Sequence, residues 1–196
     1  MNQTIDRSVR VKVKLLRPKL WADLEALFGT KGACGGCWCM YWRQEKGEKW
    51  ESTKGPVNRA RFKKLVRTNK AHGALAYCGA MPIGWVSFDR RTDFSKLDRA
   101  PSLKCSDAET VWSIPCFYVK AGYRNKGVAK ALLKFAVAYL KREKKVRVIE
   151  GYPVRNKVSK IPAAFAWTGT ESLFKSAGFK PTDSESAGKR RMRISK

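Results

Sequence analysis

The order of hydrophobic patterns along the chain predicts an α/β fold, with a single mixed β-sheet covered by helices. Short segments in which apolar and polar residues alternate indicate half-buried strands, and longer segments with apolar residues at helical spacing separate them. The chain has 196 residues, of which 43% are hydrophobic, and this suffices for one buried core. No repeat or linker divides the sequence, so we expect one domain over residues 1–196.

The N-terminal part predicts one strand followed by two helices. Apolar residues alternate with Arg and Lys over residues 9–15, which is the period of a half-buried strand. Pro18 then begins a segment to residue 28 with leucines at helical spacing. After a segment rich in cysteine and glycine and a polar stretch, residues 57–68 predict the second helix.

The middle of the chain predicts three strands. Residues 74–78 and 83–88 are apolar and are joined by a tight turn over residues 79–82. Residues 89–109 show no regular pattern, and we expect an irregular excursion there. The third of these strands is predicted over residues 111–119.

The C-terminal part predicts a long helix, a strand, a late helix and a last strand. The long helix covers residues 127–145, and the next strand covers residues 146–152. The late helix lies within residues 163–177 and ends at Gly178, which suits a left-handed cap. The last strand is expected over residues 191–195. The apolar stripe expected on the long helix consists of Val128, Leu132, Phe135 and Tyr139.

The junction between the 111–119 strand and the long helix has the features of an anion-binding site. The first N–H groups of a helix have no partner within the helix, and the helix dipole is positive there. Gly127 has no Cβ, so a phosphate could approach the backbone closely. Arg124 and Lys126 add positive charge beside it.

The residues of this junction resemble the cofactor motif of the GNAT superfamily of acetyltransferases. That motif is Arg/Gln-x-x-Gly-x-Gly/Ala with a valine five residues upstream, and here Val119, Arg124, Gly127 and Ala129 match it. The segment 172–179 also looks like the family's late helix ending in Gly-Phe. The resemblance implies a mostly antiparallel sheet with helices on both faces and with the fourth and fifth strands splayed apart. Pro115 lies where the bulge at this splay is expected.

The resemblance also implies that the chain transfers an acetyl group from acetyl-CoA to a primary amine by direct attack in a ternary complex. Phe117, Tyr118 and Val119 would pair with the pantetheine arm. The pyrophosphate would be held at Arg124, Asn125, Lys126, Gly127, Val128, Ala129 and Lys130.

Two positions that carry catalytic groups in many relatives are altered here. The usual tyrosine acid is Phe174, and the glutamate base of some relatives corresponds to Ser113. Glu150 and Tyr152 are two residues apart on a predicted strand, so they emerge on one face and are our catalytic candidates. A structural role for Glu150 stays open, as does base catalysis by Glu109 or catalysis by positioning alone.

The segment Cys34-x-x-Cys37-x-Cys39 permits several roles. Three cysteines fall short of the four ligands that structural zinc needs, so we predict no metal. A redox or acyl-carrying thiol would need a lowered pKa, and plain structural thiols are a further alternative. In the GNAT superfamily this segment usually covers the acceptor site, and some bacterial members contain a similar Cys-Gly-Gly-Cys-Trp-Cys segment. We therefore assign the acceptor pocket to Cys34, Cys37, Trp38, Cys39 and Tyr41, with Trp42 as a further flat surface.

The charge of the chain leaves a second class of function open. Lys and Arg number 42 against 16 Asp and Glu, a formal net charge of +26. Together with the basic run at residues 189–193, this favours an RNA- or ribosome-associated acetyltransferase as the main alternative. A metal or redox sensor that keeps the fold is the third hypothesis. No apolar run reaches the length of a membrane helix and no secretory signal is visible, so we expect a cytoplasmic protein without membrane contact, in which a homodimer is possible.

Overall fold

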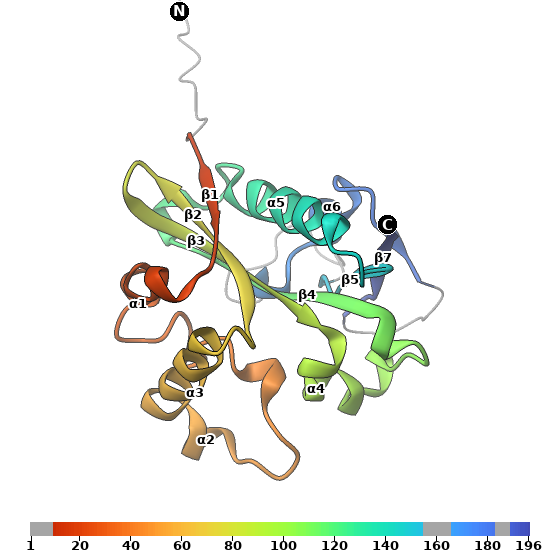
Figure 1. Cartoon of the computed structure of the whole chain (residues 1–196), viewed down its shortest axis with the longest axis horizontal. Coiled ribbons are helices and arrows are strands. Elements are labelled where there is room, and N and C mark those ends of the chain that lie inside the picture. Colours follow the sequence, from red (N-terminus) through yellow and green to blue (C-terminus); the bar gives the residue numbers. More distant parts are fainter. Residues whose placement is uncertain (1–9, 155–165, 183–188) are drawn as a thin grey trace, which may run out of the picture.

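The computed structural model describes residues 10–154, 166–182 and 189–196, and it shows one open seven-stranded sheet (Figure 1). The strand order is β1-β2-β3-β4-β5-β7-β6, and only the β4–β5 pair is parallel. The expected mixed, mostly antiparallel sheet is confirmed. The strands are β1 (Lys12–Leu15), β2 (His72–Cys78), β3 (Met81–Arg90), β4 (Val111–Val119), β5 (Val148–Gly151), β6 (Lys180–Pro181) and β7 (Met192–Ser195).

Helices cover both faces of this sheet (Figure 1). The longest helix, α5, packs on β2 and β3 from one side, and α1 packs on β3 from the other. The α-helices are α1 (Trp21–Phe28), α2 (Trp50–Thr53), α3 (Pro56–Arg67), α4 (Ser95–Arg99), α5 (Val128–Arg142) and α6 (Glu171–Lys175). The 3-10 helices are η1 (Pro18–Leu20), η2 (Tyr41–Arg43), η3 (Arg91–Asp93), η4 (Pro101–Leu103), η5 (Ala108–Thr110), η6 (Ala121–Tyr123) and η7 (Ala166–Thr168).

The buried side of α5 differs from the expected stripe. Val128 and Leu132 are buried as expected, but Phe135 and Tyr139 are only partly buried, and Ala136 takes the central position. The start of the helix lies close to the sheet, because a Cβ on Gly84 of β3 would lie 2.8 Å from Val128 Cγ1.

Several short elements were missed because they carry little sequence pattern. The region expected to be irregular contains α4 and three 3-10 helices, and β6 has two residues that pair only with β7. α2 is a single turn in the stretch expected to be polar coil. α6 is shorter than the expected late helix. Residues 163–165 of that expected helix, and residue 9 of the expected first strand, lie outside the described residues. Gly178 has φ +85°, as the expected left-handed cap requires.

β4 and β5 diverge halfway along β4. They pair only between Val111–Ile114 and Val148–Gly151, whereas β4 continues to Val119. Pro115 follows directly after the last paired residue, and the register against β3 shifts between Ser87 and Asp89 at this level. A proline removes one donor from the sheet and so favours such a bulge. The expected splay of the fourth and fifth strands, with Pro115 at its start, is confirmed.

Candidate functional site

The turn before α5 is exposed and shaped by two residues in the left-handed region. Asn125 has φ +59° and Gly127 has φ +77°. The side chain of Arg124 is tied back to the strand, because its Nε donates to the Val119 carbonyl at 3.1 Å. A Cβ built on Gly127 meets no heavy atom within 4 Å, so the space above this residue is open. The turn therefore presents backbone and positive charge to solvent.

The amides of this turn are available to a ligand. The N–H groups of residues 125–130 donate no hydrogen bond to another backbone group in the described part of the chain. The first hydrogen bond across the helix start runs from Ala131 N–H to the Gly127 carbonyl at 3.0 Å. Val128 is buried through its side chain, whereas Lys126 and Lys130 are exposed. Unpaired amides at the positive end of a helix fit a pyrophosphate.

β4 offers one backbone edge next to this turn. Residues 117–119 pair with β3 on one side, and no described strand pairs with them on the side of β5. The side chain of Phe117 packs against Phe174 with ring centroids 6.0 Å apart, and Tyr118 packs against Phe28 at 5.8 Å. Side chains therefore anchor this part of β4 in the core from both faces, and its backbone edge is the part that faces the divergence.

Trp42 of η2 lies where β4 and β5 separate. Its Nε1 donates to the Pro115 carbonyl at 3.2 Å, and its ring is 6.4 Å from the ring of Tyr152. Trp167 of η7 packs on the same indole at 5.6 Å. The sequence identified Trp42 as a flat surface near the acceptor, but nothing in it indicated a contact with Pro115.

Tyr152, directly after β5, belongs to a buried polar network. Its hydroxyl receives a hydrogen bond from Arg91 Nη1 at 2.8 Å and shares one with Ser113 Oγ at 2.6 Å. Burial, with the nearby charge of Glu150, raises the pKa of Tyr152 well above its usual range. The proton therefore stays on this hydroxyl over the physiological range.

Glu150 is fully buried among arginines. Arg91 Nη1 donates to its Oε1 at 3.1 Å, Arg191 Nε donates to its Oε2 at 3.0 Å, and Arg193 pairs with the same Oε2. The same-face prediction for Glu150 and Tyr152 is confirmed, because Arg91 Nη1 contacts both. These pairs hold both carboxylate oxygens and favour the structural alternative for Glu150.

Phe174 and Glu109, the two remaining positions considered from the sequence, lie in different surroundings. Phe174 is fully buried and packs against Phe179 at 5.0 Å, so it belongs to the core. Glu109 is exposed in η5, ahead of the first residue of β4. Arg91 was missed because it lies in the region without a regular pattern.

The cysteine segment lies largely against the core rather than around a cavity. Trp38 and Cys39 are buried, and Trp85 Nε1 donates to Cys39 Sγ at 2.8 Å. Cys34 is exposed, and burial raises the pKa of Cys37 to about 12. A thiol with a raised pKa is a poor nucleophile, which disfavours the acyl-carrying alternative. In the described part of the chain no three His, Cys, Asp or Glu side chains are arranged to hold a metal ion.

A cavity of about 350 Å³ opens between η2 and the α4–η4 region. Tyr41 and Trp42 supply aromatic surface, and Lys96, Arg99 and Lys189 supply positive charge. Lys96 Nζ lies 3.8 Å from the centroid of the Tyr41 ring. Of the five residues assigned to an acceptor pocket from the sequence, Tyr41 is the one that lines this cavity.

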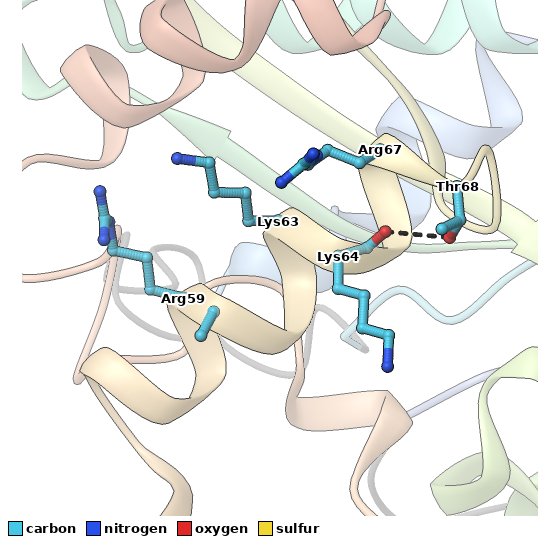
Figure 2. Close-up of a pocket in the computed structure, with 6 residues that line it drawn as sticks. Arg59, Lys63, Lys64, Arg67 and Thr68 are labelled. Atoms are coloured by element: carbon cyan, nitrogen blue, oxygen red, sulfur yellow. Dashed lines mark hydrogen bonds between the residues drawn. The ribbon is translucent and has the colours of Figure 1, made fainter.

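A second basic surface lies on the solvent side of α3. Figure 2 shows Arg59, Lys63, Lys64 and Arg67 extending from successive turns of this helix around a shallow hollow. Helical spacing of four residues places Arg59, Lys63 and Arg67 in one line. Within this group Arg59 pairs with Glu25, whereas Lys64 and Arg67 are exposed.

The basic run at residues 189–193 is engaged in internal ion pairs. Arg190 pairs with Glu171 at 3.6 Å, and Arg193 forms two hydrogen bonds of 2.8 Å with Asp107. Arg191 is tied to Glu150 and to the Lys104 carbonyl. The arginines of this run therefore hold this end of the sheet together, while Lys189 lines the cavity beside η2.

Comparisons with known proteins agree with this geometry. The sequence profile of the "Acetyltransferase (GNAT) family" matches residues 37–157. The GNAT domain of S. lividans PAT is similar in structure, with TM-score 0.54, 18% identity and coverage of 95% of this chain and 90% of that chain. The yncA protein of Salmonella typhimurium, whose structure includes its cofactor acetyl-CoA, has TM-score 0.53, 12% identity and coverage of 94% and 93%. The search of curated proteins gave no match. None of the helices in the described ranges is long and apolar enough to cross a membrane.

Proposed function

Because the chain belongs to the GNAT acetyltransferase family, whose cofactor is acetyl-CoA, we propose that it transfers the acetyl group to a primary amine. The proposed route is direct attack of the amine while both substrates are bound. One observation carries the proposal: within the described part of the chain, β4 has a backbone edge without a partner strand over residues 117–119, and this edge leads to the unpaired amides at the start of α5. The bound cofactor would supply an acetyl group activated as a thioester.

The residues proposed for the cofactor form two continuous parts. The backbone of Phe117, Tyr118 and Val119 would pair with the pantetheine arm, as an added strand would pair with β4. The pyrophosphate would be bound by the amides and charges of the turn and helix start, with Lys126 and Lys130 exposed on either side of Gly127. The residues proposed for this turn are Arg124, Asn125, Lys126, Gly127, Val128, Ala129 and Lys130.

The acid–base groups are proposed from the buried network beside the divergence. Tyr152 lies next to Trp42 at the start of the splay, so we propose it as the donor to the departing sulfur. The proton lost by the attacking amine replaces the one that Tyr152 gives to the sulfur, so the products are the amide and free coenzyme A. Glu150 acts as a positioning residue, because it fixes the guanidinium of Arg91 that binds the Tyr152 hydroxyl. The positive charge of Arg91 also favours negative charge that develops nearby.

Kinetics with the purified chain test this proposal. A panel of primary amines is incubated with acetyl-CoA, and acetylated products are identified by mass spectrometry. Initial rates at varied concentrations of both substrates should give intersecting lines, as expected for a ternary complex. Parallel lines would indicate a covalent acetyl-enzyme and would contradict direct attack. Absence of transfer to every amine, with acetyl-CoA bound, would contradict the reaction itself.

A second candidate is an acetyltransferase that associates with RNA. The observation that favours it is the basic line on α3, where Lys63 and Arg67 lie beside Lys64 (Figure 2). Arg59 of the same line pairs with Glu25. Binding of an unrelated RNA duplex should weaken steeply with salt, with a slope that decreases when Lys63 and Arg67 are changed to Gln. A slope that stays the same in this variant would remove α3 from the candidate.

A further inference from the structure

The cavity between η2 and α4 adjoins the point where β4 and β5 diverge. Trp42 belongs to both, since one part of its side chain lines the cavity and its Nε1 binds the Pro115 carbonyl. The turn that leads into α5 lies beyond the other end of β4, whose last residue, Val119, is roughly 13 Å from Pro115 at 3.3 Å per residue. The positive side chains of the cavity are therefore distinct from those proposed for the cofactor phosphates.

The lining of this cavity is positively charged. Lys96, Arg99 and Lys189 line it, and no carboxylate does so among the described residues. Lys96 donates one hydrogen bond to Gln44 Oε1 at 2.8 Å, and Arg99 donates to the Gln44 carbonyl. An ammonium has three donors and a guanidinium has five, so both groups retain donors for a ligand.

Lys96 and Lys189 are held close to aromatic surface and partly out of water, whereas Arg99 is exposed. Lys189 Nζ lies 5.8 Å from the Trp42 ring and 5.2 Å from the Trp167 ring. Partial burial lowers the pKa of Lys96, with a smaller effect from the charge of Arg99, and burial also lowers the pKa of Lys189. An anion bound here would offset the cost of keeping these charges together.

We propose that this cavity binds the acyl acceptor and selects primary amines that also carry an anionic group, a carboxylate or a phosphate, on an apolar or aromatic body. This inference rests on the proposed function and adds the class of acceptor to it. Lys96 and Arg99 bind the anionic group by charge-assisted hydrogen bonds, while Tyr41 and Trp42 contact the body of the ligand. Polycationic amines are repelled by the same wall, because like charges at short range raise the energy of the complex.

Pairs of amines that differ only in the anionic group test this selection. Suitable pairs are L-tryptophan with tryptamine, L-phenylalanine with phenethylamine, and O-phosphoethanolamine with ethanolamine. The first two pairs measure a preference for carboxylate and the third measures a preference for phosphate. We expect kcat/KM to be higher for the anionic member of at least one pair by about tenfold or more.

Variants localise this preference. Arg99→Gln and Lys96→Met should each lower kcat/KM for the anionic amine by about tenfold to a hundredfold and leave its partner within about twofold. Arg142→Gln, on the exposed end of α5, removes the same charge far from the cavity and is the matched control. The intrinsic reactivity of each amine cancels when kcat/KM of a variant is divided by that of the unchanged chain for the same amine. The inference is overturned if a variant lowers kcat/KM equally for both members of a pair. It is also overturned if the amine without the anionic group is preferred in every pair.

A binding measurement separates this inference from the proposed reaction. Tryptophan fluorescence is titrated with 3-phenylpropionate, which has the carboxylate and the ring but no amine, and with 3-phenylpropionamide as its neutral counterpart. The carboxylate should bind at least about tenfold more tightly, and Arg99→Gln should abolish the difference. If no amine is acetylated but this difference is found, the acetyl transfer to amines fails and the anion site stands. If both probes bind equally, or neither binds, the inference is refuted whatever the activity.

Discussion

Replacing Gly127 with aspartate tests the cofactor site where α5 begins. Gly127 is exposed, has φ +77°, and has open space where a Cβ would be. The substitution therefore costs about 1 kcal/mol of backbone strain in the folded state, without a steric clash in the free protein. A carboxylate at a helix N-terminus also interacts favourably with the helix dipole, so the fold should survive.

The loss of cofactor affinity follows from charge and from the amides of the turn. A carboxylate about 5 Å from each phosphate of a pyrophosphate, in a solvent-exposed site, costs about 0.8 kcal/mol per phosphate charge. Two phosphates give about 1.7 kcal/mol, or roughly twentyfold in Kd. The new side chain can also accept hydrogen bonds from the unpaired amides of residues 128–130, which removes donors from the ligand. We expect acetyl-CoA affinity to decrease by about twentyfold or more.

Isothermal titration calorimetry with acetyl-CoA measures this effect, and thermal unfolding verifies the fold. Gly127→Ala introduces the backbone strain without the charge and should weaken binding by a much smaller factor. Gly122→Asp adds the same charge in exposed, open space within η6, five residues earlier in the chain. If Gly127→Asp binds acetyl-CoA within about twofold of the unchanged chain, the assignment of the pyrophosphate to this turn is refuted.

Four further predictions concern individual side chains. Glu150→Gln removes the buried carboxylate that Arg91, Arg191 and Arg193 share, although Arg91 keeps its pair with Asp98. It should lower the free energy of unfolding by about 3–5 kcal/mol in urea titrations, whereas a loss below about 1 kcal/mol would argue against the ion-pair role. Tyr152→Phe should lower kcat with unchanged acetyl-CoA affinity, and an unchanged kcat would return Tyr152 to a structural role. The hydrogen bond to Asp89 raises the pKa of His72 above 6.5, so its contribution to stability is complete below pH 6.5 and is lost as the pH rises through the raised pKa. His72→Gln should remove this decrease in the urea midpoint, and an unaltered pH profile in the variant would contradict it. Intact mass after incubation with acetyl-CoA alone should show no acetylated Cys37, and a stoichiometric adduct would restore the acyl-carrying thiol.

Local sequence was sufficient to predict the fold class and the turn before α5. Alternation with a period of two and helical spacing depend on residues within a few positions of one another, and so does the exposure of amides at a helix start. Gly127 and Arg124 could therefore be identified without tertiary structure. The position of Pro115 at the divergence could be predicted in the same way, because proline lacks a backbone N–H donor whatever its tertiary contacts.

The buried network and the cavity depended on contacts between distant parts of the chain. Trp42 reaches Pro115 across 73 positions, and Arg91 reaches Glu150 across 59. Nothing in the local pattern distinguishes a buried, paired glutamate from a catalytic one, because the difference depends on which side chains the intervening segments bring to it. The path of η2 and α4 decided that Lys96 and Arg99 share a cavity with Tyr41 while Trp38 and Cys39 pack in the core. Sequence determined where the acetyl donor is expected to bind, and tertiary packing decided which residues line the cavity proposed for the acceptor. Burial and charge pairing depend on the three-dimensional path of the chain.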